Sequence, residues 1–93
     1  SANTKVLFIN FGDKEALYAM QAISKLRKEQ IPAELYPDSA KMGKQMGYAD
    51  KRDIAYTVLA GTSEMEAGTY TLKNMKTGEQ EAVGIEDLIN RLK

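Results

Sequence analysis

The residues best suited to binding chemistry gather in the stretch KQMGYADKRD, at positions 44–53. Two lysines, an arginine, a glutamine and a tyrosine occur there, although the chain as a whole carries 13 basic and 13 acidic residues and no net charge. A neutral total with separated signs permits a local positive surface. The stretch therefore indicates either a helix that meets a polyanion or a helix face that is only solvated, as most surface lysines are.

The composition speaks against catalysis in this chain. It contains no cysteine and no histidine, which removes disulfides, thiolate metal sites and the commonest general base. The segment INFGDKEA (9–16) has one glycine and matches no glycine-rich phosphate loop. Glu64 and Glu66 form a pair of acids, but two acids in a loop more often confer solubility than catalysis. Binding is therefore favoured over an enzymatic reaction.

The length of 93 residues predicts one domain, residues 1–93. The small polar residues 1–3 are expected to be partly a remnant of expression, without a functional role. No apolar run is long enough to span a bilayer, and the first residues do not form a signal peptide. Together with the absence of cysteine, this favours a cytoplasmic protein with no membrane partner.

Hydrophobic patterns predict five strands. Continuous apolar runs predict buried strands at 5–11 and 54–61, and a further strand lies between two prolines at 31–37. Alternation predicts a half-exposed strand at 69–75, and the turn after it returns the chain as a short strand at 80–83. The last two strands should therefore form a hairpin.

Helical spacing predicts three helices. The first covers 14–30 with Asp13 as its N-cap, and the last covers 84–93. The basic helix begins near residue 42 and should end at Asp53 in a left-handed conformation. The apolar face of the first helix is expected to comprise Leu17, Met20, Ile23 and Leu26.

This order of elements predicts the α/β class. We expect a three-layer α/β/α fold with a five-stranded, mostly parallel mixed sheet, an antiparallel C-terminal hairpin and helices on both faces. In such sheets ligands bind beyond the carboxyl ends of the parallel strands. The segments FGD (11–13), YPDSA (36–40) and GTSE (61–64) should meet there, and the basic helix begins from the second of them.

Two longer segments resemble a known family. KQMGYADKRDIAYTVLAGTSE (44–64) followed by GTYTLKNMKTGEQ (68–80) is similar to the carboxyl-terminal anticodon-binding domain of class IIa aminoacyl-tRNA synthetases, and within that group to the histidyl-tRNA synthetases. The resemblance runs from Val6 to Leu92. It rests on the basic helix with ADK, the apolar strand, G-x-x-E, and a strand with a basic residue before TGEQ. KNMKTGEQ (73–80) favours the histidine group over its threonine, proline and glycine relatives.

The resemblance implies a domain that docks the unpaired bases of a tRNA anticodon loop. Glu64 would accept hydrogen bonds from base amino or imino groups, and the Gln45 amide would both donate and accept hydrogen bonds at a base edge. Tyr48 would stack on a base or, alternatively, be a half-buried helix tyrosine. The lysines would position phosphates or bases. Glu64 and Lys44 should share one concave shelf. The implied nucleic-acid-binding residues are Lys44, Gln45, Tyr48, Lys51, Glu64 and Lys73.

The resemblance also implies that the chain is a fragment of a larger synthetase, with no catalytic residue, metal or cofactor of its own. The parent enzyme would use ATP with Mg to attach histidine to its tRNA in protein biosynthesis. It would contain a catalytic domain next to this one and form a homodimer in the cytoplasm. These expectations come from the family and not from composition or spacing.

The chain departs from the family pattern in three respects. Asp53 stands where the family usually has glycine, and Thr62 stands where it often has a second acid beside Glu64. Gly43 and Gly47 replace bulkier residues that are common in this helix, which should make the helix looser. Two other functions remain open at this point. One is an anticodon-domain-like module of a regulatory paralogue, and the other is a flavodoxin-like domain that binds a small ligand or acts in signalling.

Overall fold

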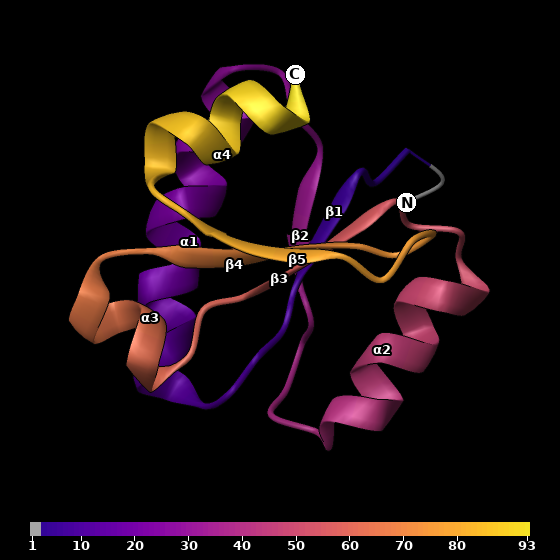
Figure 1. Cartoon of the computed structure of the whole chain (residues 1–93). Coiled ribbons are helices and arrows are strands. Elements are labelled where there is room, and N and C mark those ends of the chain that lie inside the picture. Colours follow the sequence, from indigo (N-terminus) through magenta and orange to yellow (C-terminus); the bar gives the residue numbers. More distant parts are fainter. Residues whose placement is uncertain (1–2) are drawn as a thin grey trace.

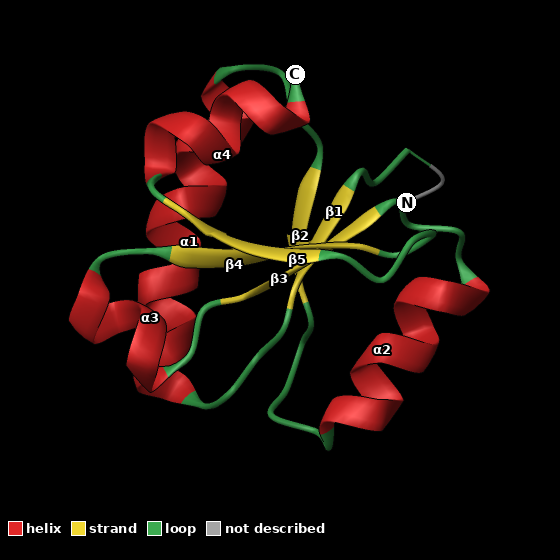
Figure 2. Cartoon of the chain, viewed as in Figure 1, coloured by secondary structure: helices red, strands yellow, loops and turns green. Residues whose placement is uncertain are grey.

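The computed structural model describes residues 3–93, and these form a five-stranded sheet with four helices, so the predicted α/β class is confirmed (Figures 1 and 2). Residues 1–2, which hold most of the expected expression remnant, lie outside the described residues. The elements are β1 (Val6–Phe8), α1 (Asp13–Lys28), β2 (Ala33–Leu35), α2 (Met42–Lys51), β3 (Tyr56–Leu59), α3 (Thr62–Ala67), β4 (Tyr70–Asn74), β5 (Gln80–Val83) and α4 (Ile85–Leu92).

The sheet has the strand order β2-β1-β3-β4-β5. β1 pairs in parallel with β2 and β3, while β4 pairs antiparallel with β3 and with β5. Parallel strands need crossover connections, and α1 and α2 supply them on opposite faces. The predicted C-terminal hairpin therefore forms one edge of the sheet, and the short strand β2 forms the other.

Side chains of β1 point alternately to the two faces of the sheet, and both faces are buried. Val6 and Phe8 pack with α1 and α4, whereas Leu7 and Ile9 pack with α2. Figure 1 shows α1, α3 and α4 together on one side of the sheet and α2 alone on the other. The larger core lies on the three-helix side, and α2 closes only a small second core.

The apolar face of α1 differs from the predicted one. Ile23 and Leu26 are fully buried, but Leu17 is 71% exposed and Met20 is 38% exposed. The buried face includes Ala19 and Ala22 instead, because small side chains let the helix approach the sheet closely. The spacing of large residues therefore gave the wrong orientation for the first half of this helix.

Two helix ends also test the sequence predictions. Asp13 is the first residue of α1 and not its cap, since Gly12 precedes the helix with φ 133° and no side chain caps it. Asp53 follows α2 with φ 56°, so the predicted left-handed ending is confirmed.

Among residues 3–93, no helix has the length and apolar character that crossing a membrane requires.

The aromatic residues on the three-helix side show how α1 and α3 are held. The rings of Tyr18 and Tyr70 stack with centroids 4.8 Å apart, and the Tyr18 hydroxyl donates to the Thr69 carbonyl at 2.7 Å. Burial raises the pKa of Tyr70 well above its usual value, so this phenol stays neutral. α1 is thereby fixed against the segment that joins α3 to β4.

Candidate nucleic-acid interface

The α2 side of the sheet is only half covered by α2. β4 and β5 continue the sheet beyond β3, and directly paired residues on neighbouring strands share a face. Leu59 pairs with Thr71 and Thr71 with Ala82, while Thr57 pairs with Lys73 and Lys73 with Gln80. Thr57 also pairs with Leu7, which packs in the α2 core, so all these residues point to the α2 side. We call the uncovered part the open face; it comprises Leu59, Thr71, Lys73, Gln80 and Ala82.

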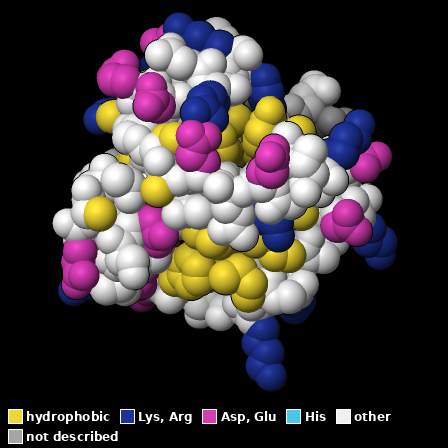
Figure 3. Space-filling model, viewed as in Figure 1, with side chains coloured by type: hydrophobic (Ala, Val, Ile, Leu, Met, Phe, Trp, Pro, Cys, Tyr) yellow, Lys and Arg dark blue, Asp and Glu magenta, His cyan; other side chains and the backbone are white. Residues whose placement is uncertain are grey.

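The open face combines apolar and polar surface. None of its five residues is fully buried. In Figure 3 an apolar patch lies between α3 and α2, with a lysine or arginine side chain at its margin. The Lys73 side chain makes no ion pair or hydrogen bond within residues 3–93. An unneutralised cation beside exposed apolar surface is suited to a ligand that is both anionic and aromatic.

Glu64 lies at the rim of the open face, where β3 ends and α3 begins. Its Oε1 accepts from the Gly61 N–H at 2.9 Å, which closes the first turn of α3 as in a capping box. Its Oε2 accepts from the Thr71 hydroxyl at 2.9 Å. Thr71 and Lys73 project from the same side of β4, two residues and thus about 7 Å apart. The structure therefore brings Glu64 and Lys73 to one surface.

Both carboxylate oxygens of Glu64 retain hydrogen-bonding capacity. A carboxylate has about four acceptor positions, and the contacts with Gly61 and Thr71 use two of them. The side chain is only partly buried. Glu64 thus has a structural role that the sequence did not reveal, and this role leaves its remaining lone pairs open to a ligand.

Gln45 does not lie at the surface, and the prediction that it reads a base edge is wrong. Its side chain is 1% exposed. Its Oε1 accepts from the Asn10 N–H at 2.7 Å, and its Nε2 donates to the Asn10 carbonyl at 2.9 Å and the Ala40 carbonyl at 2.7 Å. Both amide hydrogens are therefore used within the protein. Gln45 fastens α2 to the loop after β1.

Tyr48 is half-buried on the flank of α2 that faces β2. Its hydroxyl donates to Glu34 at 3.3 Å, and its ring lies edge-on to that of Tyr36 with centroids 5.4 Å apart. The Arg52 guanidinium sits 4.8 Å from the centre of the Tyr48 ring. A hydrogen bond from the Thr4 hydroxyl lowers the pKa of Glu34, which keeps that carboxylate charged as an acceptor. These contacts match the half-buried alternative for Tyr48.

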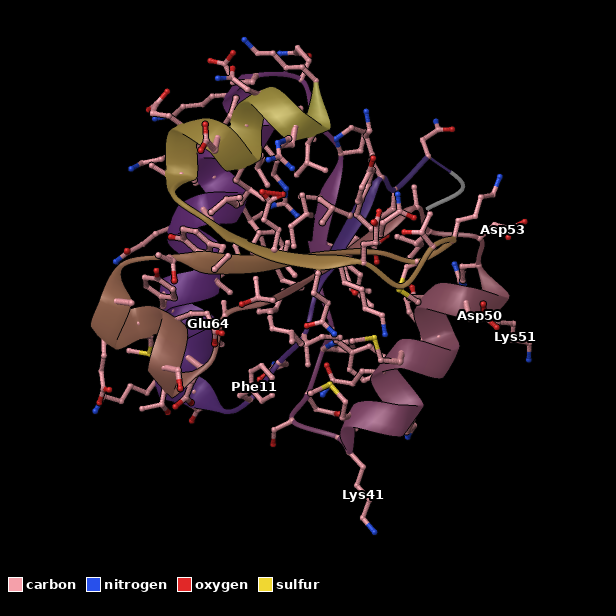
Figure 4. The ribbon with its side chains drawn as sticks, viewed as in Figure 1. Phe11, Lys41, Asp50, Lys51, Asp53 and Glu64 are labelled. Atoms are coloured by element: carbon pink, nitrogen blue, oxygen red, sulfur yellow. The ribbon has the colours of Figure 1, made fainter. Side chains whose placement is uncertain are left out.

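The shelf expected between Glu64 and Lys44 does not form. Residues three and four apart share one side of a helix, so Lys44 and Lys51 lie on the same flank as Tyr48, toward β2. The opposite flank, which carries Asp50, lines a hollow with Asn74 at the end of β4. Since β2 and β4 stand on opposite sides of the β1–β3 pair, Lys44 lies on the flank of α2 that faces away from β4 and Glu64. Figure 4 also places Lys51 at the end of α2 remote from Glu64.

Phe11 is the residue at this site that the sequence analysis did not select. It follows β1, is 39% exposed, and lies beside Glu64 near the start of α3 (Figure 4). The segment FGD was predicted to reach this edge of the sheet, but the phenylalanine itself was taken as the end of a buried strand. Sequence alone could not show that the strand ends three residues earlier, at Phe8.

The described residues form no metal site, and a strong exposed ion pair lies away from the open face. Residues 3–93 contain no group of three or more acidic, histidine or cysteine side chains that could hold a metal ion. The Arg91 guanidinium lowers the pKa of Glu81 through two hydrogen bonds, of 2.7 and 2.8 Å, but this exposed pair joins α4 to β5 on the three-helix side. The open face and its rim are therefore the candidate interface.

Fold and surface together define an α/β domain whose mixed sheet is left partly uncovered, and this uncovered part is its candidate interface. The comparisons with known proteins specify it further. A family model described as "Anticodon binding domain" matches residues 5–93, so the chain belongs to the anticodon-binding domain family. This family match rules out the flavodoxin-like alternative.

Histidine–tRNA ligases are among the curated relatives of this chain. The chain is 65% identical to that of Christiangramia forsetii over 91 residues, 98% of this chain and 20% of that protein. It is 57% identical to that of Flavobacterium johnsoniae over 88 residues, 95% of this chain and 18% of that protein. The chain thus spans about a fifth of the length of these curated relatives.

Solved structures show the same relationship. Histidyl-tRNA synthetase from Nostoc sp. PCC 7120 superposes with a TM-score of 0.90 at 27% identity, covering 96% of this chain and 21% of that one. The RNA-binding domain of threonyl-tRNA synthetase from Cryptosporidium parvum gives a TM-score of 0.89 at 18% identity, covering 97% of this chain and 23% of that one. The second likeness shows the shared fold alone.

Proposed function

We propose that this chain is the anticodon-binding domain of a histidine–tRNA ligase and docks the anticodon loop of histidine tRNA. Support comes from the family match over residues 5–93 and from relatives of that name, of which the chain spans about a fifth. The remaining four fifths of such a parent would contain the catalytic domain. The parent, a cytoplasmic homodimer, would use ATP with Mg to attach histidine, and this domain would only position the tRNA.

The RNA is expected to lie on the open face. The observation that carries this assignment is the juxtaposition of the partly exposed Glu64 carboxylate with Lys73, an unpaired cation on an uncovered sheet. Unpaired bases of an RNA loop are recognised by hydrogen bonds at their edges, while cations hold the phosphates. Glu64 would accept from a base edge, and Lys73 would contact a base or the adjacent phosphate.

The cations on the other flank of α2 are expected to act at longer range. Lys44 and Lys51 are exposed and make no ion pair within residues 3–93. The flank that they share with Tyr48 could meet the phosphates of a stem or of the far side of a loop. Such contacts would add affinity without sequence discrimination.

Titration with an RNA hairpin tests the proposed function. The chain should bind the anticodon hairpin of histidine tRNA more tightly than a hairpin with the same stem and an unrelated loop. If three lysines contact phosphates, the slope of log K against log salt should be about −2, which is a loss of roughly tenfold to twentyfold between 50 and 200 mM salt. Fluorescence anisotropy at several salt concentrations would measure both quantities. Equal affinity for the two hairpins would refute the proposed specificity for the anticodon loop of histidine tRNA.

Replacing Lys44 with methionine should weaken all hairpins alike. Loss of one phosphate contact is expected to reduce the salt slope by about 1 and to leave the ratio of the affinities for the two hairpins unchanged. The matched control is Lys25→Met, which removes an exposed cation from α1 on the other side of the sheet. A Lys44 variant that changed the ratio of the two affinities would show that this flank of α2 reads bases.

A further inference from the structure

Phe11 stands out because the chain exposes this ring at the rim of the candidate interface. Phe8, three residues earlier, is fully buried, whereas Phe11 is 39% exposed. A lone exposed aromatic needs no explanation by itself. The backbone around Phe11, however, is held by more hydrogen bonds than an exposed residue without a function would need.

The backbone on both sides of Phe11 is clamped. Asn10 has its N–H and its carbonyl bound to the buried Gln45 amide, at 2.7 and 2.9 Å. The Asn10 side chain donates to the Tyr36 carbonyl at 3.0 Å and accepts from the Gly12 N–H at 2.9 Å. The bond to the Asn10 carbonyl and the bond from the Gly12 N–H hold the two peptide units that flank Phe11, and the other two bonds fix Asn10 itself. Little backbone entropy remains to be lost when a ligand meets this ring.

The ring is set directly beside Glu64. A Cβ atom added at Gly61 would lie 3.6 Å from the Phe11 ring and 3.2 Å from Glu64 Oε1, so ring and carboxylate approach the same backbone position. A glycine at 61 keeps the space between them free of a side chain. A base lying on the ring would therefore bring its edge close to a hydrogen-bond acceptor.

We propose that Phe11 is a stacking platform for one unpaired base of the bound RNA. This inference rests on the proposed function and adds a residue to its site. Single-stranded bases are commonly held by stacking on an aromatic side chain while their edges are hydrogen-bonded. Phe11 supplies the apolar plane, Glu64 the acceptor, and Lys73 on the same side of the sheet the cation. An apolar segment of a protein partner would not use this combination of charges.

Three variants of the 93-residue chain test the platform. Phe11→Ala and Phe11→Leu should weaken the cognate hairpin by about 5- to 150-fold, because neither side chain has a π face. Phe11→Trp should retain affinity and introduce the only tryptophan of the chain, whose fluorescence should be quenched when the hairpin binds. The matched control is Asn90→Trp at an exposed position of α4, which should bind equally well and show no quenching.

The outcomes separate this inference from the proposed function. If the unaltered chain does not prefer the cognate hairpin, the proposed function fails and the platform with it. If it does prefer that hairpin but Phe11→Leu binds as tightly, Phe11 is not a platform, although the function stands. A bound hairpin that leaves Phe11→Trp unquenched likewise overturns the stacking.

Discussion

Replacing Gln45 with leucine is expected to lower the free energy of unfolding by about 3 kcal/mol. The two side chains are similar in size, but leucine removes three hydrogen bonds, to the Asn10 N–H, the Asn10 carbonyl and the Ala40 carbonyl. A buried polar group without a partner costs about 1–3 kcal/mol, and water can reach the less buried Ala40 carbonyl after the change. Urea unfolding at unchanged m-value would measure the shift in midpoint.

The matched control for this variant is Gln21→Leu on α1. Gln21 is exposed, and changes at exposed positions away from caps and networks usually stay within about 0.5 kcal/mol. If Gln45→Leu were as stable as the control, the clamp around Asn10 would carry no net energy. A loss above about 2 kcal/mol would show that α2 is held to the sheet by a polar contact as well as by its small core.

The strands were predictable because their burial leaves a direct mark on the sequence. β1 is buried on both faces, so its residues form a continuous apolar run, and the alternation of 69–75 reflects the half-covered strand β4. α3 was missed for a physical reason. A helix of six residues has no repeating apolar face, and with Gly61 as its cap it lacks the serine or threonine that usually marks a capping box.

The candidate site was predictable only in part. The sequence placed Glu64 and the FGD segment at the carboxyl edge of the sheet, and the structure confirms that position. It could not give the rotation of α2 about its axis, which is set by the burial of Gln45 and Ala49. A polar glutamine among lysines looks like part of a solvated surface. With the rotation unknown, Lys44 was assigned to the wrong flank.

Replacing Glu64 with glutamine is expected to leave the fold nearly intact while removing about 1–3 kcal/mol of discrimination at one base. The amide oxygen of glutamine can still accept from the Gly61 N–H. Its NH₂ group can donate to the Thr71 hydroxyl, which accepts as well as it donates. The charge and one acceptor are lost, so a base that offers only donors to the carboxylate would meet a donor instead.

The comparison with Glu64→Ala separates the two roles of this side chain. Alanine removes the bonds to Gly61 and Thr71 as well as the charge, so it should cost about 1 kcal/mol of stability or more, as loss of a cap does. Competition between hairpins that differ at a single anticodon base would measure discrimination, and urea unfolding would measure stability. If glutamine kept full discrimination, Glu64 would be a cap for α3 alone. If the glutamine variant lost discrimination at unchanged stability, the Glu64 carboxylate would read a base while its two hydrogen bonds within the protein hold it in place. A rigid acceptor at the rim of an open sheet can in this way select among flexible, unpaired nucleotides.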